Sequence, residues 1–219
     1  MKPYYDEDGI TIYHGDCREL LPTLKADLLL TDPPYGIGIS SRNTVGSSTK
    51  RNGKVILARD FGVSDWDDAP PPEWLLMLMR EQTRWQIIFG GNYFPLPPSR
   101  CWLVWDKDNS GNFADCELAW TNLDKAVRKL KWRWNGMLQE DMEHKEFRTH
   151  PTQKPLAVMK WALAQAPEGV TNILDPFMGS GTSLVAAKAA GIRAIGIERE
   201  EKYCADAAER LSQGLLSFA

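Results

Sequence analysis

The chain has 219 residues, which is within the range of one domain, and 43% of them are hydrophobic while 25% are charged. That balance is typical of an ordinary globular protein, and it argues against a membrane-embedded chain because no apolar stretch reaches the roughly 18 residues that a spanning helix needs. The formal net charge of -3 excludes a general attraction to polyanions, so any contact with nucleic acid has to come from a local basic surface.

The cysteines and the first residues of the chain indicate the cellular compartment in which we expect the protein. The four cysteines have no CxxC spacing and lie mostly in apolar neighbourhoods, which favours reduced, buried thiols over disulfides or a zinc site. They are Cys17, Cys101, Cys116 and Cys204. The opening sequence MKPYYDED lacks the apolar core of a secretory signal. We therefore expect a cytoplasmic protein without a metal site.

Apolar runs and breakers along the chain predict strands that alternate with helices, which is typical of an α/β layered domain. In chain order we expect a strand at 10–13, a helix at 16–24, a strand at 27–31, a helix at 72–82 and strands at 86–91 and 101–105. The second half continues with a helix at 155–166, a strand at 171–174, a helix at 182–190, a strand at 193–197 and a closing helix at 200–213. The apolar run within 27–31 is typical of parallel strands buried on both faces. No repeat is visible, and we expect a single domain over residues 1–219.

One polar stretch interrupts this alternation early in the chain. Residues 37–54 are rich in Ser, Thr, Asn and Gly, with Arg42, Lys50, Arg51 and Lys54 interspersed. We expect a mobile loop over about residues 37–58 that could close over a bound ligand. A plain solvated loop is an equal alternative.

A basic and aromatic stretch follows later. Residues 125–134 alternate basic with apolar side chains and end in two tryptophans, a pattern that suits phosphate contacts flanked by stacking or wedging aromatic rings. A basic strand face with its tryptophans in the core is about as common. The residues concerned are Lys125, Arg128, Lys129, Lys131, Arg133, Trp132 and Trp134.

Two motifs follow apolar strands, one in each half of the chain. The first, at 31–36, reads TDPPYG, and the second, at 175–182, reads DPFMGSGT. Consecutive prolines fix φ and push each preceding residue into extended geometry, so the first motif presents a preset backbone carbonyl. The glycines of the second motif permit a tight turn and a close approach of the backbone to a ligand at a helix N-terminus.

The second motif disfavours two common cofactor classes. A dinucleotide fingerprint requires a third glycine where this chain has Leu184, and a P-loop requires a Gly-Lys-Ser/Thr sequence that does not follow. Glu198 closes the next strand, roughly 20 residues beyond Asp175, from where an acid reaches ribose hydroxyls in related α/β folds. A surface glutamate after a buried strand is the alternative.

With these two motifs in this order, the chain resembles the exocyclic-amino DNA methyltransferases, which methylate adenine N6 or cytosine N4. The catalytic motif comes first, as in their beta group. The likeness covers most of residues 10–204 and implies a seven-stranded Rossmann-like α/β fold, circularly permuted so that its cofactor half comes last. It also implies S-adenosylmethionine as the cofactor, held by the second motif, while the first holds the base.

The resemblance assigns catalytic roles to the first motif. The lone pair of an exocyclic amine is delocalised into the ring, so Asp32 and the Pro33 carbonyl would each accept one N–H and turn the nitrogen toward tetrahedral geometry. Pro34 completes the rigid turn, and Tyr35 offers a ring for stacking on a base that has flipped out of the duplex. An ordinary aspartate pKa near 4 predicts that the proton leaves only after methylation.

The resemblance also implies a set of cofactor contacts. Lys154, within the segment HPTQKP at 150–155, would pair with the cofactor carboxylate, and Asp16 would contact its adenine, although Asp16 could instead only cap a helix. His150 is expected to be structural. The segments 89–92 and 115–118 match weaker motifs that line the base pocket. The expected cofactor-binding residues are Asp16, Lys154, Asp175, Phe177, Gly179, Ser180, Gly181, Thr182 and Glu198.

The segment available for target recognition is short, since only residues 119–149 separate Leu118 from His150. A short recognition element, a second subunit in a homodimer, or the loop at 37–54 could each supply specificity. The expected DNA-binding residues are Arg42, Lys50, Arg51, Arg128, Lys129, Lys131 and Arg133.

Aspartate at position 32 resembles the adenine-type motif, because many cytosine-N4 enzymes have serine there, so we expect methylation of adenine N6 in DNA, with cytosine N4 as the alternative. An RNA or protein-glutamine amino methyltransferase is more distant, since those usually place the glycine loop first. An inactive DNA-binding subunit is a further alternative, but Asp32, Tyr35 and Glu198 are intact. A restriction-modification partner and a solitary role both stay open.

Overall fold

The computed structural model describes residues 1–37, 67, 69–109, 114–135, 138–150 and 152–213, together with the backbones of four short strands. These strands are β4 (Thr44–Val45), β5 (Thr49–Arg51), β6 (Lys54–Ile56) and β7 (Arg59–Asp60). Apart from them and Ile37, the expected mobile loop at 37–58 lies outside the described residues, as do Arg42 and the side chains of Lys50 and Arg51.

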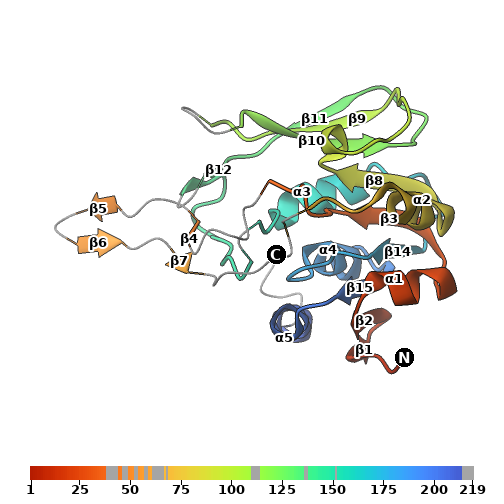
Figure 1. The fold of residues 1–219 in the computed structure, drawn as a ribbon. Helices are drawn as coiled ribbons and strands as arrows, with labels where there is room; N and C mark the ends of the chain where they lie inside the picture. The colour runs from red at the N-terminus through yellow and green to blue at the C-terminus, as the bar shows by residue number, and fades with distance from the viewer. Residues whose placement is uncertain are drawn as a thin grey trace.

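One large sheet runs through the molecule (Figure 1). Its strands are β1 (Tyr5–Glu7), β2 (Ile10–His14), β3 (Ala26–Thr31), β8 (Thr83–Phe89), β9 (Trp102–Asp106), β10 (Cys116–Thr121), β11 (Arg128–Lys131), β14 (Asn172–Asp175) and β15 (Arg193–Glu198). Their order is β1-β2-β15-β14-β3-β8-β10-β9-β11. Strands β2, β15, β14, β3 and β8 are parallel, whereas β10 is antiparallel to both of its neighbours. A separate hairpin pairs β12 (Trp134–Asn135) with β13 (Leu138–Gln139).

Helices cover both faces of this sheet (Figure 1). On one face lie α3 (Leu156–Leu163), α4 (Thr182–Ala189) and α5 (Glu201–Ser212), and on the other lie α1 (Cys17–Leu20), the short 3-10 helix η1 (Leu21–Thr23) and α2 (Glu73–Glu81). Side chains alternate along a strand, so Leu28 and Leu30 pack against the first set of helices while Leu29 packs against the second. All three are fully buried, which explains why β3 has an apolar run instead of alternation.

The helices and strands expected from the sequence are confirmed, with shifts of a few residues at their ends. Strand β8 begins at Thr83, three residues before the expected start. We expected a sheet of seven strands, whereas the sheet among the described residues has nine. The two additional strands are β1 and β11, which lie at its two edges. Short edge strands are exposed and carry little hydrophobic pattern, as the burial of β1 and β11 illustrates.

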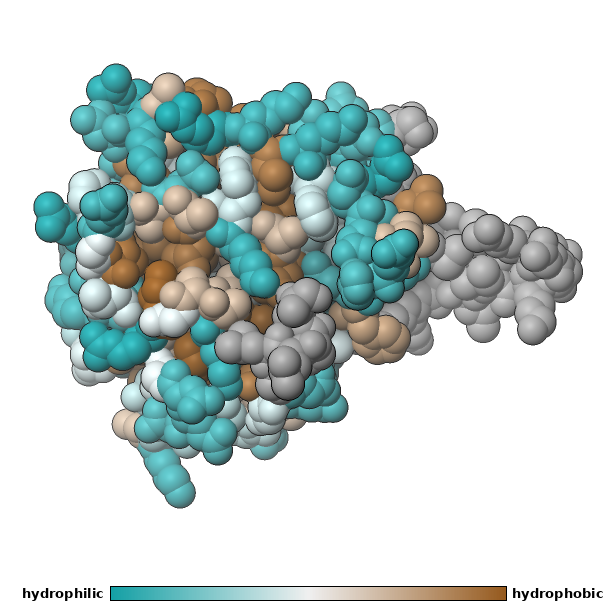
Figure 2. Space-filling model, turned by 180° about the vertical axis from the view of Figure 1, so that it is seen from behind, coloured by the Kyte–Doolittle hydropathy of each residue, from teal (hydrophilic) through white to brown (hydrophobic). Residues whose placement is uncertain are grey.

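The described surface is mostly polar. Figure 2 shows hydrophilic side chains spread across the face seen from behind, with apolar side chains in patches between them. Among the described residues no helix has both the length and the apolar character to cross a membrane. The expectation of buried thiols holds for Cys17, Cys101 and Cys204 but is wrong for Cys116, which is exposed at the start of β10.

Candidate active site

The two sequence motifs lie side by side because β3 and β14 are neighbouring parallel strands. Ile173 pairs with Leu28 and Leu174 with Leu29, so both strands end at the same edge of the sheet. Asp175 closes β14, and Asp32 follows β3 directly. In open α/β sheets the crevice outside the carboxyl ends of the strands, where the strand order changes direction, is where ligands bind.

A buried hydrogen bond joins the two motifs directly. The Thr31 hydroxyl donates to Oδ1 of Asp175 over 2.7 Å, and the backbone N–H of Phe177 donates to the same oxygen over 3.1 Å. The Ser183 hydroxyl donates to Oδ2. Burial raises the pKa of Asp175 to about 6, and these hydrogen bonds oppose the rise. Through these hydrogen bonds Asp175 holds the glycine loop in place.

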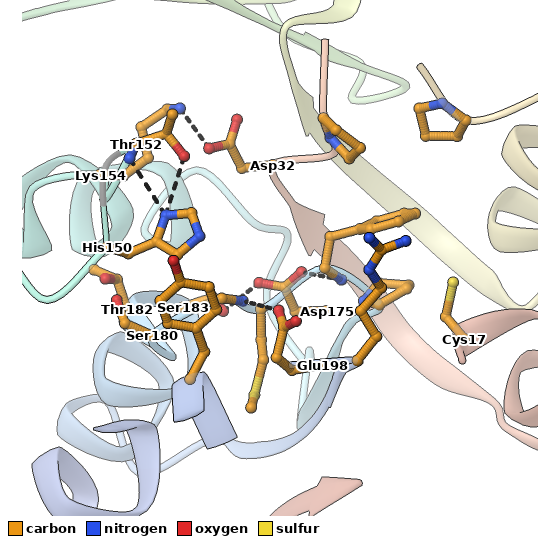
Figure 3. Close-up of a pocket in the computed structure, with 18 of the residues that line it drawn as sticks. Cys17, Asp32, His150, Thr152, Lys154, Asp175, Ser180, Thr182, Ser183 and Glu198 are labelled. Atoms are coloured by element: carbon orange, nitrogen blue, oxygen red, sulfur yellow. Dashed lines mark hydrogen bonds and ion pairs between the residues drawn. The ribbon is translucent and has the colours of Figure 1, made fainter. Parts of the chain in front are cut away.

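A cavity of about 310 Å³ opens at this edge of the sheet and is lined by residues of both motifs. In Figure 3, Asp32 and Lys154 lie on one side of the cavity and Asp175 and Glu198 on the other. The volume is at the lower end of the range for small-molecule sites. Further lining residues are Asp16, Cys17, His150, Thr152, Gln153, Phe177, Met178, Gly179, Ser180, Thr182, Ser183 and Tyr203.

The first motif is held in place by contacts that its sequence does not reveal. Oδ1 of Asp67 accepts the backbone N–H of Tyr35 over 2.9 Å and that of Gly36 over 3.0 Å. The Tyr35 ring stacks on Tyr93, with 4.9 Å between ring centroids and 15° between planes, and its hydroxyl donates to Oδ1 of Asp32 over 2.6 Å. A Cβ on Gly90 would lie 2.1 Å from the Tyr35 ring, so only glycine leaves room for this tyrosine.

Asp32 belongs to a buried network of charges. Nζ of Lys154 lies 2.5 Å from Oδ2 of Asp32 and 3.1 Å from Oε2 of Glu117, and Lys107 pairs with the other oxygen of Glu117. Burial raises the pKa of Asp32, while Lys154 opposes the rise. Burial alone would lower the pKa of Lys154, but the two carboxylates outweigh it and raise that pKa. The ordinary pKa assumed for Asp32 from the sequence is thus corrected upward.

The glycine loop ends at the N-terminus of α4. The backbone N–H of Gly179 donates to Oε2 of Glu198 over 3.0 Å, which ties the acid at the end of β15 to the loop. Gly181 has a left-handed φ of +75°, and a Cβ there would lie 2.8 Å from Cβ of Ala207 on α5. Glycine is therefore required at this position by the packing of α5 against the loop.

Three residues from segments that the resemblance placed at the cofactor site make defined contacts in the structure. Asp16 caps α1, because its Oδ1 accepts the backbone N–H of Arg18 over 2.9 Å, and the Arg18 side chain also pairs with it. Lys154 lines the cavity but pairs with Asp32 and Glu117. His150 is buried against Tyr203, with ring centroids 4.3 Å apart, and burial lowers its pKa to about 3, which agrees with a neutral, structural histidine.

The basic stretch lies on the edge strand β11 and the residues after it. Lys129 pairs with Asp106 over 2.8 Å, while Lys131 and Arg133 both pair with Asp108. These side chains are about half exposed or more, and Arg128 is exposed as well. A surface with these cations is therefore present, with part of its charge neutralised.

The tryptophans of that stretch pack inward. The Trp132 ring packs against the hydrophobic core, and its carbonyl accepts the indole N–H of Trp105 over 2.8 Å. Trp134 is buried, with the Arg148 guanidinium 4.5 Å from its ring. The alternative of a core tryptophan is confirmed for Trp134, whereas Trp132 is only partly buried against the core.

Sequence reasoning missed Asp67, Tyr93 and Lys107 and gave little weight to Glu117. The only sequence signal was indirect, since Glu117 lies within the weak match at 115–118. Asp67 is separated from the first motif by a long polar stretch, and Lys107 becomes relevant only because β9 and β10 pair, with Asp106 opposite Cys116. Contacts of this kind depend on strand register, which the sequence does not display.

Comparisons with known proteins agree with this geometry. A family model described as DNA methylase matches residues 98–209. The type II methyltransferase M2.LlaDCHI of Lactococcus lactis subsp. cremoris is 27% identical over 97% of this chain and 93% of its own length, and M2.DpnII of Streptococcus pneumoniae is 26% identical over 96% and 92%.

Two solved structures are similar in fold. The complex of M1.HpyAVI with SAM has a TM-score of 0.54 and 26% identity, covering 92% of this chain and all of that one. The PvuII DNA methyltransferase, described as cytosine-N4-specific, has a TM-score of 0.60 and 14% identity, covering 96% of this chain and 89% of that one. These likenesses confirm the Rossmann-like fold expected from the sequence.

Proposed function

The chain belongs to the DNA methylase family, and from that premise we propose that it transfers a methyl group to the N6 amine of adenine in DNA. Membership makes it a site-specific DNA methyltransferase for the exocyclic amine of adenine or cytosine, with S-adenosylmethionine as its cofactor. One observation carries the assignment of the site: the Thr31 to Asp175 hydrogen bond joins the two motifs beside a cavity that Asp32 and Glu198 both line.

The cavity residues fit the chemical groups of S-adenosylmethionine. Glu198 places a carboxylate at the glycine loop, where it can accept hydrogen bonds from ribose hydroxyls, and Phe177 offers a half-buried ring to the adenine. Ser180 and Thr182 bring hydroxyls and backbone groups to the loop at the start of α4. We propose these residues, with Gly179, Gly181 and Asp16, as the cofactor site, while Asp175 supports it from below.

The catalytic residues act on the amine of the flipped base. Bound S-adenosylmethionine supplies a sulfonium methyl group, whose bond to sulfur breaks as the new bond to nitrogen forms and whose bonding electrons stay on sulfur. Asp32 and the Pro33 carbonyl each accept one N–H, which localises the nitrogen lone pair. The methylated nitrogen then loses one proton along its hydrogen bond to Asp32, whose raised pKa makes it a better acceptor than an exposed aspartate.

Adenine is preferred over cytosine because of the aspartate at position 32. Tyr35 supports the flipped base from one side, and its ring is itself backed by the half-exposed Tyr93. The type II methyltransferases among the relatives support a role in restriction-modification.

We assign DNA contacts to the exposed cations of β11 and its flank, in the segment 119–149. Lys129, Lys131 and Arg133 would exchange their present aspartate partners for phosphates or add to them, and the exposed Arg128 would add a further phosphate contact. A homodimer is a further proposal, which analytical ultracentrifugation in the presence of DNA tests.

Methyl transfer to DNA is tested by incubating the protein with methyl-labelled S-adenosylmethionine and unmodified duplex DNA, followed by digestion to nucleosides and mass spectrometry. Label on N6-methyladenine is the expected result. Label on cytosine N4 would keep the mechanism and overturn the choice of base. Absence of label in DNA, with transfer to RNA or to a protein glutamine, would overturn the proposed substrate.

The catalytic assignment is tested with Asp32→Ala. Cofactor binding should persist, while the rate of methyl transfer should fall by about 100- to 1,000-fold, the loss seen when a preorganised polar group is removed from a reaction site. Asp124→Ala, at an exposed ion pair with Arg100, is the matched control. Unchanged methylation by Asp32→Ala would refute the role of Asp32.

A further inference from the structure

Lys154 is buried in the network around Asp32, with 7% of its side chain exposed. Its ammonium contacts three oxygen atoms: Oδ2 of Asp32 at 2.5 Å, Oε2 of Glu117 at 3.1 Å and the Tyr35 hydroxyl at 3.3 Å. Two of these contacts are hydrogen bonds, to Asp32 and Tyr35, and the third is an ion pair with Glu117. The charge of Lys154 is therefore already matched by two carboxylates, with which a carboxylate of the cofactor would have to compete.

The environment of Lys154 also favours its position beside the first motif. Its Nζ lies 5.4 Å from the ring centroid of Tyr35 and 5.6 Å from that of Phe89, so aromatic faces add attraction for the cation. On the far side, Glu117 is in turn paired with Lys107. Because removing one partner leaves a buried charge uncompensated, this network resists rearrangement.

The lysine and tyrosine contacts account for both oxygens of Asp32. Lys154 binds Oδ2 and the Tyr35 hydroxyl donates to Oδ1, so the orientation of the carboxylate is fixed from two sides. Each oxygen keeps a further lone pair, with which it can accept an amine N–H. A carboxylate held in this way does not have to be ordered when the base arrives.

We propose that Lys154 is a positioning residue that acts through Asp32, holding the catalytic carboxylate ionised and aimed at the amine, and that it is not a ligand of the cofactor. This inference rests on the proposed function, because it assigns Lys154 a role in the same methyl transfer. Glu117 and Lys107 hold Lys154 in turn.

The consequence for pH follows from the groups that face Asp32. They are Lys154 and the Tyr35 hydroxyl in direct contact, Glu117 from β10 with Lys107 behind it, and Asp175 from the end of β14. Burial raises the pKa of Asp32, Glu117 adds to the rise, and Lys154 is the cation that opposes it. Loss of that cation should therefore raise the pKa of Asp32 further and move the acidic limb of the rate to higher pH.

The test compares Lys154→Met, which removes the charge, with Lys154→Arg, which keeps it. Single-turnover rates of methyl transfer at saturating S-adenosylmethionine are measured against pH, and the cofactor Kd is measured by calorimetry. For Lys154→Met we expect a fall in rate of about 100-fold with a Kd within about threefold of the wild type, because misplacement of a catalytic group affects the reaction step. Its acidic limb should move to higher pH.

Lys154→Arg should keep the cofactor Kd and the wild-type position of the acidic limb, with an intermediate rate, and it decides the question if Lys154→Met does not fold. Lys160→Met, a lysine of α3 outside the network, is the control for a Lys to Met change.

A rise in the cofactor Kd of either Lys154 variant, with a normal rate at saturating cofactor, would overturn the inference and indicate that Lys154 binds the cofactor. An acidic limb that stays in place in Lys154→Met would overturn it as well. Both failures leave the wild-type enzyme active on DNA, whereas failure of the proposed function leaves the wild type without methyl transfer and overturns both.

Discussion

The hydrogen bond between Thr31 and Asp175 should be worth more when Asp175 is charged than when it is protonated. Thr31→Val replaces the hydroxyl by a methyl group of similar shape at a fully buried position. At pH 7.5 the substitution removes a donor from a buried carboxylate, which costs about 1.5–3 kcal/mol. At pH 5 Asp175 is largely protonated, since its pKa is about 6, and the lost bond between neutral groups costs only about 1 kcal/mol.

The direction of this pH dependence follows from linkage. The folded pKa of Asp175, about 6, lies above the ordinary value of 3.8, so the folded state binds the proton more tightly. The protonated Asp175 carboxyl therefore stabilises the folded state fully below about pH 4, and this stabilisation is lost as the pH rises through 6. The total loss in the free energy of unfolding is about 3 kcal/mol. Thr31→Val removes one of the bonds that limit the rise, so its stability should fall more steeply with pH than that of the wild type.

Urea unfolding at pH 5 and pH 7.5 measures both effects, and the melting temperature at pH 7.5 should fall by about 3–10 °C. Thr121→Val is the matched control, because Thr121 is equally buried and its hydroxyl donates over the same 2.7 Å to the neutral carbonyl of Cys101. Its cost should not change between the two pH values. Equal costs of Thr31→Val at pH 5 and pH 7.5 would refute the argument that Asp175 is charged at neutral pH.

Three further outcomes are expected. Gly90→Ala should displace the Tyr35 ring, because φ is +68° and the new Cβ would lie 2.1 Å from that ring, and methyl transfer should fall by about 100-fold with cofactor affinity retained in calorimetry. Glu198→Gln should weaken cofactor binding by about tenfold, the loss of roughly 1.4 kcal/mol from one charge-assisted hydrogen bond; unaltered affinity would contradict its assignment. Glu117→Gln should lower the free energy of unfolding in urea by about 3 kcal/mol, since the buried Lys154 and the partly buried Lys107 both lose a carboxylate partner.

The sequence predicted the helices and strands well because their hydrophobic periodicity is strong. The apolar run of β3 and the glycine loop before α4 are local features. Each of the two motifs consists of consecutive residues, so its chemistry can be inferred without a structure. The edge strands β1 and β11 were not predicted because exposed strands carry little hydrophobic pattern. The interior strand β10 was also missing from the expected elements.

The sequence by itself therefore determined the α/β class, the two motifs and the order in which they occur, because these depend on neighbouring residues. Only the tertiary structure decided that Thr31 contacts Asp175, that Lys154 faces Asp32 and Glu117, and that Trp134 of the basic stretch belongs to the core. The physical reason is that such contacts join residues more than a hundred positions apart, as in Thr31 and Asp175, or depend on which face of a strand is buried. Strand order and register, which arise from the packing of the whole sheet, bring those side chains together.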